Sequence, residues 1–153
     1  MKVKNLMTDF VREIQREDDV MTVAKIMRDN DIGFLPVIDN DNKVIGVVTD
    51  RDIVTRVIAM GENLYTKVDD VMTFPVYTVR EEDELGVAAK QMSENQIRRL
   101  VVVDASDKLA GVISLGDLAT SQMTDDRAKT ALTSISKPSN DTNHGLEIGD
   151  FPL

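Results

Sequence analysis

The sequence contains no cysteine and no tryptophan, a single histidine, and aromatic residues at only 4% of its 153 positions. The lack of cysteine excludes disulfides, thiolate zinc sites and cysteine nucleophiles. The one histidine, His144, lies in a polar stretch near the C-terminus, which argues against a Ser-His-Asp triad or a multi-histidine metal site. With so few catalytic side chains, the chain is expected to act by binding and not as an enzyme.

Positive charge and long hydrophobic runs are also scarce. The chain has 18 Lys+Arg and 27 Asp+Glu, a net charge of −9. This charge argues against a nucleic-acid partner, because duplex-binding proteins need a basic face. The most apolar stretches, 44–48 and 100–103, are about five residues long, whereas a membrane-spanning helix needs about 20. The N-terminus has no apolar core of the length of a secretory signal. The sequence therefore predicts a soluble, cytoplasmic protein without membrane insertion.

The main feature that is present is an internal repeat. A shift of 65 positions aligns Val3–Val54 with Val68–Ala119 without gaps, and 18 of the 52 pairs are identical. Each copy of a repeat is one supersecondary unit that buries its apolar face against its neighbour. Two copies therefore predict a closed pair about a pseudo-two-fold axis, with residues 1–66 as the first unit and 67–132 as the second.

Residues 133–153 lie outside the repeat. This segment is rich in Ser, Asn, Asp, Pro and Gly and has few apolar residues to bury. Such a composition predicts a flexible tail. Docking of Leu146, Ile148 and Phe151 onto a partner is the alternative.

Each copy predicts the order helix, strand, strand, helix. In the first copy, apolar residues at i, i+3, i+4 and i+7 indicate a helix over about 18–30. Two β-branched runs, 34–38 and 44–48, flank the polar segment 39–43 and predict a hairpin. A second helix is expected over about 50–60. The second copy repeats the helix stripe with Leu85, Ala88, Ala89 and Met92 and predicts the other elements over 99–103, 109–113 and 115–123. Short extended segments near 11–14 and 76–79 complete each sheet. The fold class predicted is α/β.

One short motif lies at the end of each hairpin, where the second strand leads into the following helix. Residues 46–52 and 111–117 both fit Gly-x-x-(Ser/Thr)-x-x-Asp. Thr49 and Ser114 are good helix N-caps, and an aspartate three positions later resembles a capping box. A helix N-terminus also presents free N–H groups to a phosphate, and a carboxylate one turn later can accept hydrogen bonds from ribose hydroxyls. Capping and ligand binding are both compatible with the motif.

The duplicated strings resemble a tandem pair of CBS motifs, the cystathionine-β-synthase-type repeats that together form a Bateman module. The resemblance covers residues 3–119 and rests on 33–39 with 46–52 and on 97–104 with 111–117. It implies two small sheets with flanking helices, as in the small stand-alone two-CBS proteins of bacteria. It also implies a non-enzymatic regulatory module, without a cofactor, that binds an adenine nucleotide in clefts between the motifs. A ligand-independent scaffold or protein-interaction module is the alternative.

The resemblance also implies which residues contact the ligand. In nucleotide-binding members the Ser/Thr-x-x-Asp element places its aspartate on the ribose and its hydroxyl on the phosphate side. A threonine near the start of each motif contributes as well, and a basic pair in the AMP-sensing subunit of AMP-activated kinase reaches phosphate. The ligand-binding residues expected here are therefore Thr8, Thr49, Arg51, Asp52, Thr73, Arg98, Arg99, Ser114 and Asp117.

The two clefts are expected to differ. Gly33-Phe34 stands where the second copy has Arg98-Arg99, and Gly116 stands where the first copy has Arg51. A guanidinium matches phosphate oxygens well, so unequal arginines predict unequal affinities. The alternative for Arg98 and Arg99 is that at least one is a solvated charge at a strand edge.

Family members commonly pair into a disc-shaped assembly, so the resemblance implies a homodimer formed through the helices near 53–60 and 118–123. A regulatory module also implies a protein partner, whose nature the sequence leaves open. Among adenosyl ligands, AMP, ADP and ATP are the leading candidates. S-adenosylmethionine, cyclic di-adenosine nucleotides and NAD-type ligands are the others.

Overall fold

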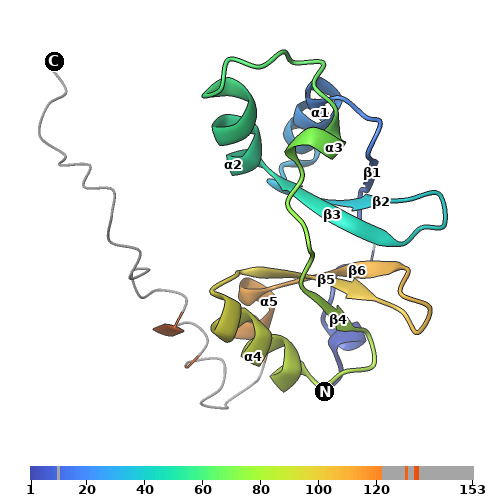
Figure 1. Ribbon diagram of the computed structural model, residues 1–153. Helices are drawn as coiled ribbons and strands as arrows, with labels where there is room; N and C mark the ends of the chain where they lie inside the picture. The colour runs from blue at the N-terminus through green and yellow to red at the C-terminus, as the bar shows by residue number, and fades with distance from the viewer. Residues whose placement is uncertain (10, 122–129, 131–132, 135–153) are drawn as a thin grey trace, which may run out of the picture.

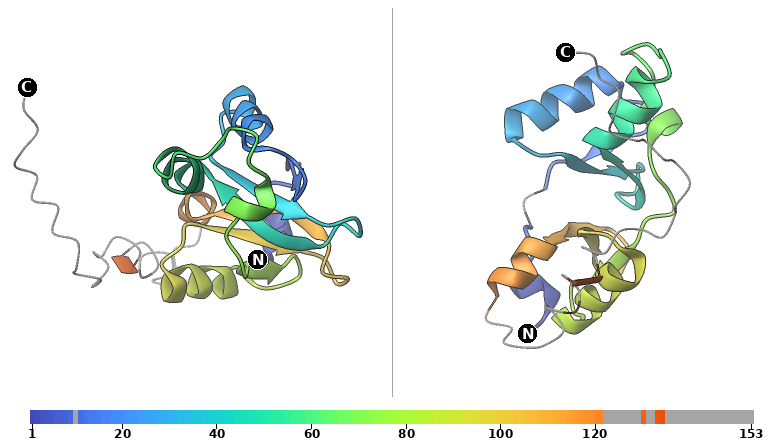
Figure 2. Two further views of the ribbon diagram at one scale, coloured as in Figure 1. Left: turned by 45° about the horizontal axis from the view of Figure 1, so that its top comes forward. Right: turned by 90° about the vertical axis from the view of Figure 1, so that its left-hand side faces the viewer.

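The computed structural model describes residues 1–9, 11–121, 130 and 133–134. Two three-stranded sheets face each other at the centre, and helices lie on the outer side of each sheet (Figure 1). The same layering is visible in two further directions in Figure 2. The expected α/β class is confirmed. The expected flexible tail lies almost wholly outside the described residues. The helix expected over 115–123 ends earlier, at Thr120, because Ser121 already has extended backbone angles.

The first unit is built as the repeat predicts. Strand β1 (Ile14–Gln15) pairs in parallel with β2 (Phe34–Ile38), which pairs antiparallel with β3 (Val44–Thr49). Helix α1 (Val20–Asn30) precedes the hairpin. Helix α2 (Asp50–Ile53) follows it and continues as the π-helical turn η2 (Val54–Ile58).

The second unit repeats this topology. Strand β4 (Thr78–Arg80) pairs in parallel with β5 (Arg99–Val103), which pairs antiparallel with β6 (Leu109–Ser114). Helix α4 (Leu85–Asn95) precedes the hairpin and α5 (Leu115–Thr120) follows it. The expected hairpins are therefore confirmed in both copies.

The hairpin turns are held by aspartates. Asp39 Oδ1 accepts hydrogen bonds from the backbone N–H groups of Asp41 and Lys43, at 2.9 and 3.0 Å. Asp104 Oδ1 does the same for Ser106 and Lys108, at 2.7 and 3.0 Å. The bonds from Lys108 and Ser106 lower the pKa of Asp104 below its ordinary value. The segment 39–43 is thus a side-chain-capped turn, as its composition predicts.

Two short elements lie outside the sequence prediction: η1 (Val3–Asn5) and α3 (Val68–Val71). Val3 is fully buried in the core of the second unit, among Leu85, Met92 and other apolar side chains. Val68 and Val71 are buried in the core of the first unit. Each core therefore takes in a segment from the start of the other copy. Segments of three or four residues have no periodicity that could have revealed this exchange.

Candidate functional site

The exchange brings Thr73 to the first unit and Thr8 to the second. Thr73 and Val47 form two backbone hydrogen bonds of 2.8 and 3.0 Å, and Thr8 and Val112 form two of 2.9 and 3.0 Å. Val47 lies on β3 and Val112 on β6, the strands that lead into the two Ser/Thr-x-x-Asp elements. Each threonine therefore lies beside the aspartate of the other copy.

Asp52 is the more heavily bonded of the two aspartates. It is 8% exposed, and its Oδ2 accepts a 2.9 Å bond from the Thr49 backbone N–H while the Thr49 hydroxyl accepts a 3.1 Å bond from the Asp52 N–H. The Thr73 hydroxyl donates to the same carboxylate at 3.2 Å. Arg56 forms an ion pair with it at 3.9 Å and donates to the carbonyl oxygens of Val71 and Met72. Burial of this charge is thus compensated by several donors.

The Asp117 carboxylate has fewer partners than that of Asp52. Its Oδ2 accepts from the Ser114 N–H at 2.7 Å and from the Ser114 hydroxyl at 2.6 Å, and the same hydroxyl accepts from the Asp117 N–H at 3.1 Å. Among the described residues, neither the Thr8 hydroxyl nor any cation contacts this carboxylate. The residue equivalent to Arg56 is Ser121. Both elements therefore form the expected capping box, and Asp117 keeps one oxygen available.

The Asp52 element opens into a cavity of about 320 Å³, here called the Asp52 cleft. This volume lies at the lower end of the range of small-molecule sites. The expected residues Thr49, Asp52, Thr73, Arg98 and Arg99 all line it. The remaining lining is mainly apolar and includes Phe34, Val47, Pro75, Val76, Tyr77 and Ile97. The cleft therefore combines hydroxyl, carboxylate and guanidinium groups with an apolar wall.

The Asp117 element opens into a second cavity of about 440 Å³, here called the Asp117 cleft. The expected residues Thr8, Ser114, Asp117 and Arg99 line it, together with Arg12 and Asp31. Arg12 occupies the position that Tyr77 has in the other copy. The Asp117 cleft is therefore more polar, because an arginine replaces an aromatic ring.

Of the nine expected ligand-binding residues, eight line at least one of the two clefts. Arg51 is exposed on α2 and is not among the described residues that line either cleft. Its role as a ligand-binding residue stays a prediction.

Three charged or aromatic residues near the clefts were not predicted from the sequence: Arg12, Arg56 and Tyr77. Arg56 lies four positions after Asp52, the spacing of an ion pair on one helix face, which was the available signal. Arg12 and Tyr77 lie in irregular segments, and no sequence pattern indicates where such side chains point.

Among the described residues, the arginines that line the clefts have no carboxylate partner. Arg16, Arg28, Arg56 and Arg80 each form an ion pair with an aspartate. The side chains of Arg12, Arg98 and Arg99 form no ion pair or hydrogen bond with any residue that the structure describes. In a chain of net charge −9, unpaired guanidinium groups in two clefts are suited to an anionic ligand.

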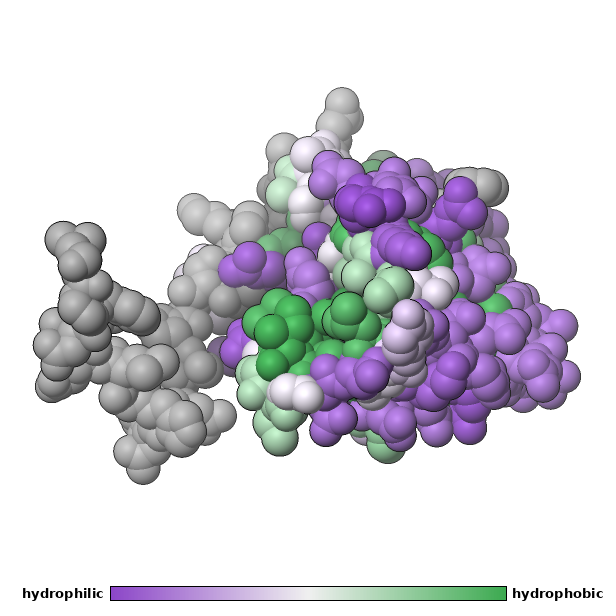
Figure 3. All heavy atoms as spheres, turned by 90° about the horizontal axis from the view of Figure 1, so that it is seen from above, coloured by the Kyte–Doolittle hydropathy of each residue, from purple (hydrophilic) through white to green (hydrophobic). Residues whose placement is uncertain are grey.

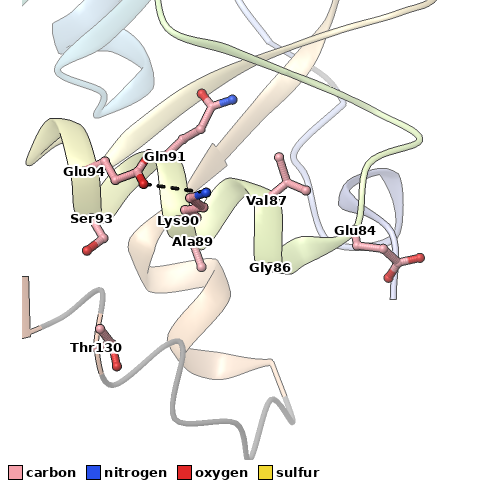
Figure 4. Close-up of a pocket in the computed structure, with 9 residues that line it drawn as sticks. All are labelled: Glu84, Gly86, Val87, Ala89, Lys90, Gln91, Ser93, Glu94 and Thr130. Atoms are coloured by element: carbon pink, nitrogen blue, oxygen red, sulfur yellow. Dashed lines mark ion pairs between the residues drawn. The ribbon is translucent and has the colours of Figure 1, made fainter.

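A further cavity of about 840 Å³ lies along helix α4, away from these groups. Figure 4 shows its lining, which comes from α4 and its N-cap Glu84 together with Thr130, with an ion pair of 3.7 Å between Lys90 and Glu94. It contains none of the expected site residues. Within the described part of the chain, no group of three or more His, Asp or Glu side chains is placed to hold a metal ion.

Comparison with known proteins identifies the family. The model of the CBS domain matches twice, at residues 3–59 and 68–123. The chain belongs to the CBS-domain family. A relative from Bacillus subtilis, YlbB, is 37% identical over 140 residues, which cover 91% of this chain and 94% of YlbB. The match to inosine-5'-monophosphate dehydrogenase of Methanocaldococcus jannaschii covers only 23% of that enzyme, so its activity is no guide to this CBS pair.

Two solved structures with a similar fold contain adenosyl ligands. CBSX2 in complex with AMP is 30% identical, with a TM-score of 0.66 and coverage of 77% of this chain and 93% of CBSX2. The CBS pair of MJ0100, in complex with 5'-methylthioadenosine and S-adenosyl-L-methionine, is 25% identical, with a TM-score of 0.70 and coverage of 78% and 93%. Among the described helices of the present CBS pair, none is long and apolar enough to cross a membrane.

Proposed function

We propose that this CBS pair is a regulatory module that binds an adenine nucleotide of the AMP, ADP or ATP class in the two clefts. The observation that carries the proposal is the lining of the Asp52 cleft, a cavity of about 320 Å³. A carboxylate that can accept hydrogen bonds from ribose hydroxyls, two threonine hydroxyls and two arginines without an ion pair to the described residues lie around it. The adenosyl ligands of CBSX2 and MJ0100 support it.

Each group has a role that follows from its chemistry. The carboxylate of Asp52 accepts hydrogen bonds from the ribose hydroxyls, which replace the bond from Thr73. Arg98 and Arg99 bind the phosphate, because a guanidinium presents paired donors to phosphate oxygens. Tyr77, 51% exposed at the cavity, provides a flat apolar surface for the adenine ring.

Calorimetric titration of the full chain with AMP, ADP and ATP tests the proposal. Asp52→Asn and Asp117→Asn should each abolish one binding event, since an amide donates where the ribose hydroxyls need an acceptor. Asp50→Asn is the matched control, because Asp50 lies on the same helix, is exposed and lines neither cleft. Absence of heat with all three nucleotides would overturn the proposal.

The second candidate is a ligand-independent scaffold. The observation that favours it is that both capping boxes are complete without a ligand. Under this alternative the two aspartate variants change the free energy of unfolding and leave every titration flat. Measuring both quantities on the same variants separates the two candidates.

The same proposal includes a homodimer, a protein partner and a cytoplasmic location. Large apolar side chains are exposed at the end of the first unit, with Val54 at 53%, Ile58 at 63% and Met60 at 68%. Figure 3 shows an apolar patch on this helical face. We define Val54 and Ile58 of η2, together with Met60 two positions after its end, as the apolar face of η2. Such a face is suited to a second copy of the chain, because exposed apolar clusters mark interaction surfaces.

A further inference from the structure

Two residues, Phe34 and Arg99, line both clefts. They are equivalent in the repeat, 65 positions apart, and each is the first residue of its strand. In the sheet registers Phe34 lies opposite Thr49, and Arg99 lies opposite Ser114. The pair therefore forms a wall between the Asp52 cleft and the Asp117 cleft.

Only one of the two residues of this wall, Arg99, carries a charge. Arg99 is exposed, and its guanidinium has no hydrogen bond or ion pair with the residues that the structure describes. It is available to an anion in either cleft. Phe34, the equivalent of Arg99 in the first copy, has no charge. At this position of the repeat the two clefts therefore share one guanidinium.

The other arginines belong to one cleft each. Arg98 lines the Asp52 cleft and Arg12 lines the Asp117 cleft. A guanidinium binds a phosphate best through two parallel hydrogen bonds, which commits the fork to one phosphate. When a phosphate in one cleft binds Arg99, the two N–H donors of its guanidinium are therefore no longer available to a phosphate in the other cleft. The bound phosphate also adds negative charge beside the second cleft.

We propose that Arg99 is a shared ligand-binding residue, so that a phosphate bound in one cleft lowers the affinity of the other cleft for a second phosphate. This inference rests on the proposed function and adds coupling between its two sites. The coupling is reciprocal, because linkage requires each ligand to affect the other equally. Adenosine has no phosphate and binds the two clefts independently.

The experiment compares each cleft alone with the same cleft as the second to fill. Calorimetry with AMP is performed on the wild-type chain and on Asp52→Asn and Asp117→Asn, which each leave one cleft functional. The weaker cleft should bind AMP about tenfold more tightly when alone than as the second event in the wild type. Arg99→Gln should weaken AMP binding in each cleft and remove this difference, and adenosine should show none in the wild type.

Arg28→Gln is the matched control, since Arg28 pairs with Asp29 and lines neither cleft. It should leave the tenfold difference unchanged. If the weaker cleft binds AMP with the same affinity in its single-cleft variant and as the second event in the wild type, Arg99 is not shared. The proposed nucleotide binding would stand in that case. The sharing would also be overturned by coupling that persists in Arg99→Gln, or by one cleft that binds no AMP even in its single-cleft variant. Failure of the wild type to bind AMP would overturn the proposed function and this inference together.

Discussion

The Thr73 hydroxyl donates a 3.2 Å hydrogen bond to the carboxylate of Asp52, although the two residues lie 21 positions apart and in different copies of the repeat. Asp52 is the only buried charged residue of the described chain. The bond joins a segment at the start of the second copy to the helix that follows the hairpin of the first copy. It therefore belongs to both the core and the Asp52 cleft.

Thr73→Val is expected to destabilise the protein by about 1–2 kcal/mol, because it removes a donor from a buried carboxylate without changing the side-chain volume much. The measurement is the free energy of unfolding in urea. Thr8→Val is the matched control, since the Thr8 hydroxyl makes no hydrogen bond with the described residues, and it should change stability by less than about 0.5 kcal/mol. Equal effects of the two variants would contradict this role for Thr73.

Gly111→Ala is expected to destabilise the second unit more than Gly46→Ala destabilises the first. A Cβ on Gly111 would lie 2.5 Å from the backbone carbonyl oxygen of Thr8, which is fixed by its pairing with Val112. A Cβ on Gly46 would meet the flexible side chain of Met72, with Sδ at 2.5 Å. Overpacking against backbone should cost about 1–3 kcal/mol.

Urea denaturation of both glycine variants tests this difference. Gly111→Ala should also weaken binding in the Asp117 cleft, because Thr8 must move. A loss of stability in Gly46→Ala as large as that in Gly111→Ala would show that the backbone contact does not decide the cost.

Glu82→Gln is expected to destabilise the protein near neutral pH and to have little effect in acid. Hydrogen bonds and charge from Lys4 and Lys2 lower the pKa of Glu82 below its ordinary value of 4.5. A carboxyl with a lower pKa in the folded state stabilises the fold above its unfolded pKa, and this contribution is lost as the pH falls through the folded value. The difference between the two proteins should therefore vanish in acid.

The measurement for Glu82 is the free energy of unfolding from about pH 7 down to about pH 3. Glu81→Gln is the control, since Glu81 forms no ion pair within the described residues. Added salt should reduce the effect of Glu82→Gln, because the pairs are exposed and screened. An effect that is constant with pH would contradict the assignment.

Ile58→Lys is expected to convert the proposed homodimer into a monomer, because it places a charge in the apolar face of η2. Ile58 is 63% exposed, so the folded unit should tolerate the change. Light scattering coupled to gel filtration measures the mass. Val87→Lys, at an exposed apolar residue on α4, is the control that should leave the dimer intact. A wild-type chain that is monomeric at all concentrations would overturn the dimer.

Much of the fold could be predicted from the sequence because its signals are local. Apolar spacing predicted α1 and α4, and β-branched runs around polar turns predicted the hairpins. Capping boxes at Thr49 and Ser114 follow from residues three positions apart. The short elements η1 and α3 could not be predicted, because three or four residues carry no period and are held by distant contacts.

By itself, the sequence determined the duplication, the α/β elements and the two Ser/Thr-x-x-Asp elements, all of which depend on residues close together in the chain. Only the tertiary structure decided that Thr73 lies with Asp52, that Thr8 lies beside Ser114 and Asp117, and that Arg99 lines both clefts. The physical reason is the backbone pairing of Thr73 with Val47 and of Thr8 with Val112. These hydrogen bonds join residues from different copies, and no local pattern encodes them.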